Sequence, residues 1–170
     1  RKSVDIDLFS NHDFDAQQLL ENIHQDFQYD LFFTAKNTLK GSIEGIKTDF
    51  LAHRYDYVSD PLTSSGIRLL SIQDIIAMKI NAITTSGQRS KDFIDIYYLL
   101  EQYEIGEMLS FYKTKYGQQH DTFVLKSLIY FNEVDLSDWP VIIKNPGLKW
   151  SAVKKRLDQK VLKHVKNAGL

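Results

Sequence analysis

Two aspartates that stand two residues apart, Asp5 and Asp7, alternate with apolar side chains near the start of the chain. A period of two predicts a strand over residues 4–9, with both carboxylates on one face and the apolar side chains directed into the core. Acidic residues are uncommon in strands, and adjacent carboxylates repel each other unless a cation lies between them. Magnesium would relieve that repulsion, because it takes oxygen ligands and keeps open positions for substrate phosphates. The alternative is a strand face exposed to water. The apolar side chains of this strand are Val4, Ile6 and Leu8.

Asp49 is a third carboxylate in a segment with the pattern of a strand. If its strand neighbours the first one, Asp49 points the same way as Asp5 and Asp7, because the apolar side chains around it form the other face. Three carboxylates on adjacent strands would form a site for two metal ions, which activate an attacking hydroxyl and neutralise a leaving pyrophosphate. Alternatively, Asp49 is an ion-pair partner of Lys47 or Arg54.

Lys79 lies in the middle of the apolar face of a predicted helix, where a lysine is expected only if it is paired or reaches out to solvent. It would face an anion in a cleft between the two halves of the chain, and a nucleotide triphosphate is the obvious anion. A lysine that extends past the edge of the core is the alternative.

Asp92 and Asp95 lie one turn apart in the first turns of the next predicted helix. The helix dipole by itself favours a carboxylate at the position of Asp92. Asp95 borders apolar residues, so we expect it to pair with Lys79 or Arg89 and to hold the two helices in register.

The elements that must position these residues are strands first and helices afterwards, which predicts an α+β fold. We expect a mixed sheet domain over 1–66 and a C-terminal helical bundle over 67–170. Two or three antiparallel strands are expected in 29–55, with turns near 36–37 and 44–45, and a loop at 60–66. Ser71 is the predicted N-cap of one helix and Ser90 that of the next. The predicted helices are 16–27, 72–83, 91–103, 105–116, 121–131 and 151–165.

The composition of the 170 residues is that of a globular protein, with 43% hydrophobic and 25% charged residues and a net charge of −1. The chain has no cysteine, which excludes disulfides and thiolate metal sites, and its five histidines show no zinc-binding spacing. Its apolar runs are short and interrupted by charge, so we expect no membrane span, no signal peptide and a cytoplasmic location.

The C-terminal segment is basic, which indicates either a solvated helix face or a surface that receives RNA. Its cations are Lys149, Lys154, Lys155, Arg156, Lys160, Lys163 and Lys166.

The ordered set RKSVDIDLF, TDF, LLSIQDIIAMKINAI and RSKDFIDIYYLL resembles the AbiEii-type abortive-infection toxins. The later segments VLKSLIYFNEVDLSDWPVIIKNP and WSAVKKRL are also similar to that family, so the resemblance covers nearly the whole chain. It implies the nucleotidyltransferase fold of the polymerase-beta superfamily. It also implies a transfer of a nucleotide from an NTP to an acceptor, dependent on Mg²⁺ or Mn²⁺.

By this resemblance, Asp5 and Asp7 match the metal-binding pair of the family. Asp49 matches the third strand carboxylate of the superfamily, in a hydrophobic context that fits less tightly. Arg1 and Ser3 match the basic and small residues that precede the metal pair, and we assign them to nucleotide binding.

In the helical part, Lys79 matches the lysine of a DxxAxK-like helix, here DIIAMK. Asp92 and Asp95 match the two acids of an RDFxDLxxLL-like helix. The resemblance implies that Lys79 and Asp92 contact the nucleotide, and that Asp95 positions Lys79 or the acceptor.

The sequence departs from the family pattern at its start. Family members carry a strand and a glycine-rich turn before the metal pair, and this element holds the triphosphate through backbone amides. The printed sequence starts at Arg1, so we expect that element to be missing and the chain to be a truncated enzyme, which puts its nucleotide binding and activity in question.

The leading hypothesis is a nucleotidyltransferase that moves an NMP onto RNA, tRNA included, or onto a protein, as the toxin of a toxin-antitoxin or phage-defence system with a cognate antitoxin. A non-catalytic module that keeps this fold and binds a protein partner is a second hypothesis. A two-metal nuclease, which shares the carboxylates but needs no NTP, is the third.

Overall fold

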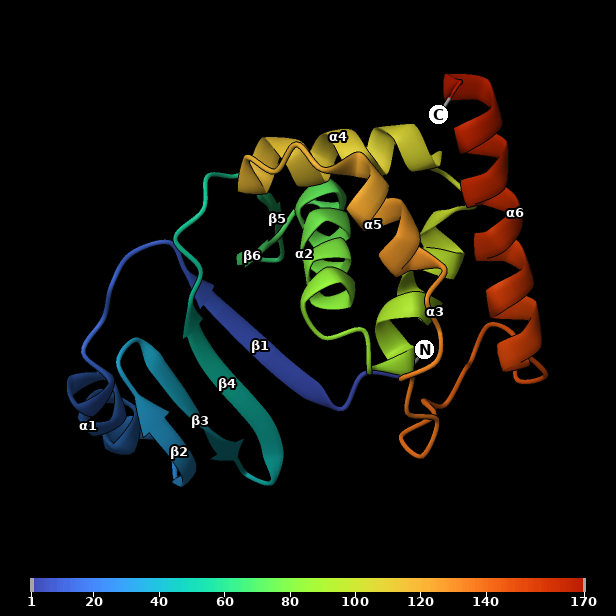
Figure 1. The fold of residues 1–170 in the computed structure, drawn as a ribbon. Coiled ribbons are helices and arrows are strands. Elements are labelled where there is room, and N and C mark those ends of the chain that lie inside the picture. The colour runs from blue at the N-terminus through green and yellow to red at the C-terminus, as the bar shows by residue number, and fades with distance from the viewer. Residues whose placement is uncertain (1, 170) are drawn as a thin grey trace. The chain divides into compact units, whose positions relative to one another are not determined.

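The computed structural model describes residues 2–169, which form two compact units, Lys2–Asp56 and residues 57–169 (Figure 1). The first unit contains a sheet and one helix, and the second contains a helical bundle with a short hairpin. The predicted α+β class is confirmed. The domain boundary that the sequence predicts after residue 66 stays a prediction.

The sheet of the first unit has the strand order β1-β4-β3-β2. β1 runs parallel to β4, and the other two neighbouring pairs are antiparallel hairpins. Glu44 and Gly45 form the second hairpin turn with φ values of 50° and 78°, the geometry that matches the twist of the flanking strands. α1 packs against β2 and β3. The elements of this unit are β1 (Asp5–Ser10), α1 (Ala16–Asp26), β2 (Tyr29–Ala35), β3 (Thr38–Ile43) and β4 (Ile46–Ala52).

The expectation that the apolar face of the first strand points into the core is wrong. Val4, Ile6 and Leu8 are 70%, 48% and 44% exposed. The reason is topological, because β1 is an edge strand and α1 lies over the opposite half of the sheet.

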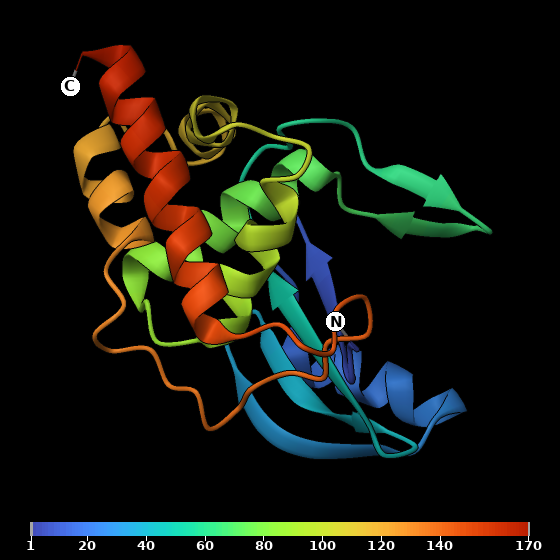
Figure 2. The same cartoon turned by 90° about the vertical axis from the view of Figure 1, so that its right-hand side faces the viewer.

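The helices of the second unit pack against one another (Figure 2). They enclose one apolar core, which draws its side chains from α2, α3, α4, α5 and α6. Phe93 lies at its centre, with its ring edge-to-face against Phe131 and Trp150 at centroid distances of 5.7 and 5.8 Å. Within residues 2–169, no helix is both long and apolar enough to cross a membrane. The elements of this unit are β5 (Leu62–Ser64), β6 (Ile67–Leu69), α2 (Ile72–Thr85), α3 (Ser90–Leu99), α4 (Ile105–Tyr116), α5 (Asp121–Leu128) and α6 (Trp150–Ala168).

The segment expected as a loop at 60–66 contains a strand and the turn of a hairpin. β5 and β6 pair in antiparallel fashion and extend away from the helices of their unit (Figure 2). Ser65 and Gly66 connect them with φ values of 51° and 78°. Two consecutive residues with positive φ form a tight hairpin turn, and the serine and glycine that suggested a loop supply it.

Two predictions of helix caps have different outcomes. Ser71 is the N-cap of α2, and its hydroxyl accepts a hydrogen bond from the backbone N–H of Asp74. Ser90 is the first residue of α3, and the cap is Arg89, which makes no side-chain cap hydrogen bond. The carbonyl of Arg89 accepts a hydrogen bond from the N–H of Asp92, which places the start of the helix one residue earlier than expected.

Candidate functional site

The three strand carboxylates lie on one face of the sheet in the first unit. In the parallel pairing of β1 with β4, Asp7 is directly opposite Asp49, and Asp5 is opposite Lys47. Opposite residues of neighbouring strands project to the same face, and alternate residues of one strand share a face. The prediction that Asp49 points the same way as Asp5 and Asp7 is therefore confirmed.

Asp49 is buried, with a side chain only 5% exposed, whereas Asp7 is exposed. Its Oδ2 atom lies 3.5 Å from Lys47 Nζ and 4.0 Å from Lys40 Nζ. Its Oδ1 atom is buried and has no hydrogen-bond partner in the described part of the chain. A buried carboxylate oxygen without a partner is costly, so a cation at this position would satisfy it.

Tyr29 supports the strand that carries Asp49. Its hydroxyl donates a 2.9 Å hydrogen bond to the backbone carbonyl of Thr48, the residue before Asp49. Burial, and then the charge of Asp49, raise the pKa of Tyr29 to about 12. The phenol therefore stays protonated and keeps donating over the whole physiological pH range.

The oxygen atoms on this face are of the type that magnesium prefers, because they belong to carboxylates, and one of them is buried without a hydrogen-bond partner in the described part of the chain. Among residues 2–169, however, no group of three His, Cys, Asp or Glu side chains is arranged to hold a metal ion. The sheet thus brings Asp5, Asp7 and Asp49 to one face, and their oxygens do not converge.

Of the two residues expected to precede the metal pair, Ser3 contacts Asp5. Its hydroxyl donates a 3.1 Å hydrogen bond to Asp5 Oδ1. Arg1 lies outside the described residues.

Lys79, Asp92 and Asp95 meet in the second unit, between α2 and α3. Lys79 Nζ lies 2.8 Å from Asp92 Oδ1 and 3.0 Å from Asp95 Oδ2. Arg89 Nε lies 3.6 Å from the other oxygen of Asp92. Of the two partners predicted for Asp95, Lys79 and Arg89, the structure shows an ion pair with Lys79, which is therefore paired rather than extended into solvent. An ammonium group has three N–H donors, and in residues 2–169 the contacts with Asp92 and Asp95 account for two of those of Lys79.

Sequence reasoning missed a fully buried ion pair in the second unit. Lys115 Nζ of α4 lies 2.7 Å from Asp74 Oδ1, and both side chains have no exposed surface. Asp74 also accepts hydrogen bonds from the hydroxyl of Ser71 and from the backbone N–H groups of Val58 and Ser59. Burial raises the pKa of Asp74, but the hydrogen bonds from Lys115, Ser71 and the two amides outweigh it and hold the pKa below its ordinary value of 3.8.

The pair fastens α4 and the segment at 58–59 to the start of α2. The burial of Lys115 could have been predicted from the sequence, since this residue follows Met108 and Tyr112 on the buried face of α4. A lysine on the apolar face of a helix suggests a buried acidic partner, but sequence alone does not say which one.

Comparison with known proteins identifies relatives of the chain. A family model described as the nucleotidyl transferase AbiEii toxin of a type IV toxin-antitoxin system matches residues 50–165. The matched range contains Lys79, Asp92 and Asp95 and begins directly after Asp49. The uncharacterized protein aq_aa25 of Aquifex aeolicus (strain VF5) is 27% identical over 173 residues, which cover 98% of this chain and 82% of that protein. No solved structure shows a significant match.

Proposed function

The chain belongs to the AbiEii family of nucleotidyltransferase toxins, and from this premise we propose that it transfers an NMP from an NTP to an RNA acceptor with the help of magnesium. Membership of a type IV toxin-antitoxin family implies a cognate antitoxin. The enzyme class follows from the family. The metal, the site residues, the RNA acceptor and a cytoplasmic place of action are proposed in addition.

In the proposed reaction, a hydroxyl oxygen of the acceptor attacks the α-phosphorus of the NTP. The new oxygen–phosphorus bond replaces the bond from the α-phosphorus to the bridging oxygen, and pyrophosphate leaves with that electron pair. Bound magnesium would neutralise the charge of the pyrophosphate and lower the pKa of the attacking hydroxyl. Asp5 and Asp7 would hold the metal, and Asp49 would accept the proton of the acceptor hydroxyl.

Two observations carry this proposal: the register of β1 with β4 sets Asp7 opposite Asp49, and Asp49 Oδ1 is buried without a hydrogen-bond partner among residues 2–169. The third donor of Lys79 supports the role of this residue toward the triphosphate. Asp92 and Asp95 hold its ammonium group in place. We propose that Arg1, Ser3 and Asp92 contact the nucleotide, and this assignment rests only on their match to the family.

Label transfer tests the proposal directly. Each of the four α-labelled NTPs is incubated with the protein, magnesium and total RNA, and labelled RNA is separated on a gel. We expect one or more nucleotides to be transferred, and chelation of the metal with EDTA should abolish the transfer. The double variant Asp5→Asn with Asp7→Asn should lose both the transfer and the rise in melting temperature that magnesium causes.

The matched control is Asp26→Asn with Asp60→Asn, which removes the same charge at two exposed positions outside β1 and β4. This control should keep the transfer. A folded protein that transfers no label contradicts the proposal and favours a binding module. RNA cleavage that needs Asp5 and Asp7 but no NTP would instead identify a two-metal nuclease.

A further inference from the structure

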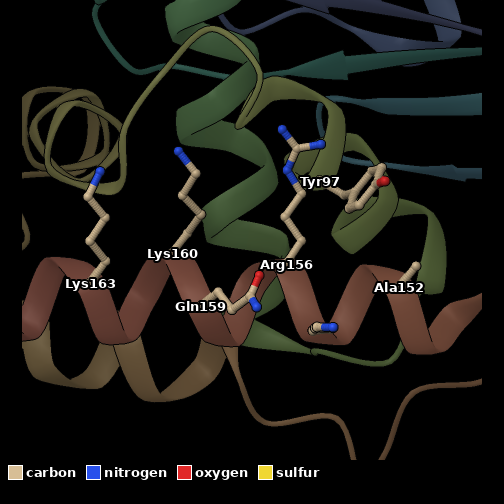
Figure 3. A pocket seen from close by; sticks show the side chains of 7 residues that line it. Tyr97, Ala152, Arg156, Gln159, Lys160 and Lys163 are labelled. Carbon is tan, nitrogen blue, oxygen red and sulfur yellow. The ribbon is translucent and has the colours of Figure 1, made fainter.

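A cationic groove runs between α3 and α6 in the second unit (Figure 3). Its volume is about 460 Å³. Figure 3 shows Arg156, Lys160 and Lys163 projecting from α6 toward the same side, with Tyr97 of α3 beside the Arg156 guanidinium. The residues that line it include Tyr97, Lys155, Arg156, Gln159, Lys160 and Lys163.

The apolar stripe of α6 explains why these cations gather in the groove. Val153, Leu157 and Val161 recur every four residues and are fully buried in the helical core. Arg156 and Lys160 lie one position before the last two of them, so they emerge at the edge of the buried stripe. At a rise of about 1.5 Å per residue, Arg156, Lys160 and Lys163 form a row over about two turns of the helix.

Two of the cations are held in place before any ligand arrives. The Arg156 guanidinium lies 4.8 Å from the centre of the Tyr97 ring and 3.6 Å from Glu101. Lys160 Nζ lies 2.9 Å from Glu104. Both side chains are about one quarter exposed, whereas a lysine on an ordinary solvated face is mobile and exposed. A preorganised site binds with a smaller loss of side-chain entropy.

The groove keeps an excess of positive charge. Four cations line it, and the two carboxylates paired with them are Glu101 and Glu104. In the described residues 2–169, Lys155 and Lys163 take part in no ion pair, and both are exposed. These two charges are therefore available to an anionic partner.

We propose that this groove binds the phosphodiester backbone of single-stranded RNA, with Lys155, Lys160 and Lys163 on phosphates and the Arg156–Tyr97 pair beside a base. The proposal rests on the proposed function in that the RNA would be the acceptor. A row of cations follows a polyphosphate chain, and arginine planes and tyrosine rings are surfaces on which unpaired bases stack. An acidic protein segment would pair with the cations, but it would leave the Arg156–Tyr97 pair without a role.

Fluorescence anisotropy tests the proposal with a labelled single-stranded RNA of about 12 nucleotides, a length within the usual range for single-strand sites. Lys155→Gln with Lys163→Gln should weaken binding about tenfold, and should reduce the slope of log affinity against log salt by about 1.4, at about 0.7 per lost phosphate contact. Arg156→Lys keeps the charge and loses the planar group, so it should also weaken RNA binding.

The matched control is Lys154→Gln with Lys166→Gln, which removes two charges from the same helix outside the groove. This control should change the affinity less than twofold. Equal losses in the two double variants would overturn the proposal, since diffuse charge would then explain the binding. Polyglutamate that binds more tightly than the RNA, or Arg156→Lys without effect on RNA, would also overturn it.

The measurement is made without NTP and repeated in the variant Asp5→Asn with Asp7→Asn, so that it does not depend on transfer. If the unchanged protein binds RNA through the groove but transfers no label, only the proposed function is contradicted. Label transfer by a protein whose RNA binding ignores the groove variants would contradict the inference alone.

Discussion

Lys79 combines a structural role with a proposed functional one. It bridges Asp92 on one side and Asp95 on the other, and the Asp92 side chain is only 4% exposed. A carboxylate so deeply buried needs its partner, because a charge left alone in the interior is costly. Loss of activity in a Lys79 variant therefore has to be separated from loss of stability.

Lys79→Met should lower the free energy of unfolding by about 2 kcal/mol, less than a fully buried pair because Lys79 is partly exposed. Urea unfolding measures this change. Lys113→Met is the matched control, since it breaks a pair of similar length, 2.7 Å to Asp121, at a more exposed position. It should cost no more than about 1 kcal/mol. Equal losses in the two variants would show that burial of Asp92 does not set the cost.

The buried Asp74–Lys115 pair should make stability depend on pH in a predictable direction. The folded pKa of Asp74 lies below its ordinary value of 3.8, so its stabilisation is complete above about pH 5 and is lost as the pH falls through the folded pKa. Asp74→Asn should cost about 3 kcal/mol at about pH 6, and the gap to the unchanged protein should narrow by about pH 3. Urea unfolding of both proteins across this range measures the gap. A gap that stays constant with pH would rule out Asp74 as the titrating group.

At the scale of elements, the position of Asp49 depends on how closely β2 approaches β3. The ring of Tyr29 lies over Gly41 on its way to the carbonyl of Thr48. A Cβ atom at Gly41 would lie 2.5 Å from the Tyr29 ring and would also collide with the backbone carbonyl of Asp30. Glycine is therefore required here because of close packing and not because of a positive φ.

Gly41→Ala should destabilise the protein by about 2 kcal/mol, because the side chain overpacks a backbone contact that cannot move alone. Gly147→Ala is the control, since its Cβ would meet nothing closer than 3.7 Å. Thermal unfolding of both variants checks the difference. If Gly41→Ala melted like Gly147→Ala, the approach of Tyr29 to Gly41 would not be a constraint on the sheet.

At the scale of the whole molecule, the two units differ in the size of their apolar cores. The large apolar cluster lies entirely in the second unit, from Ile76 to Val165. Among residues 2–56, the buried apolar side chains are Tyr29 and Leu39. A segment of this size with so few buried apolar side chains has little to offset its conformational entropy.

The fragment 57–170 should therefore fold by itself and unfold in one cooperative thermal transition, whereas the fragment 1–56 should not. Circular dichroism of the two separate fragments during heating measures this. A cooperative transition in 1–56, or none in 57–170, would contradict this division of stability.

The AbiEii resemblance inferred from the sequence is confirmed, and so is much of its local structure. The turns at 36–37 and 44–45, the cap at Ser71 and the bounds of α4 were all predicted from residue types within a few positions. An ion pair of Asp95 with Lys79 or Arg89 was predicted as well, since helical spacing and an odd charge on an apolar face restrict the choice of partner, and the structure shows the pair with Lys79.

What the sequence by itself determined is the helices, the strands of the first unit and the face on which their polar side chains project, because periodicity and capping act over one or two turns of chain. Only the tertiary structure decided which faces meet. It set Asp7 opposite Asp49 and left the apolar face of β1 exposed. It also buried Lys115 against Asp74, 41 positions away, and brought Tyr97 to Arg156. Such contacts depend on the packing of the whole unit, and many pairings of distant residues are compatible with the same local pattern.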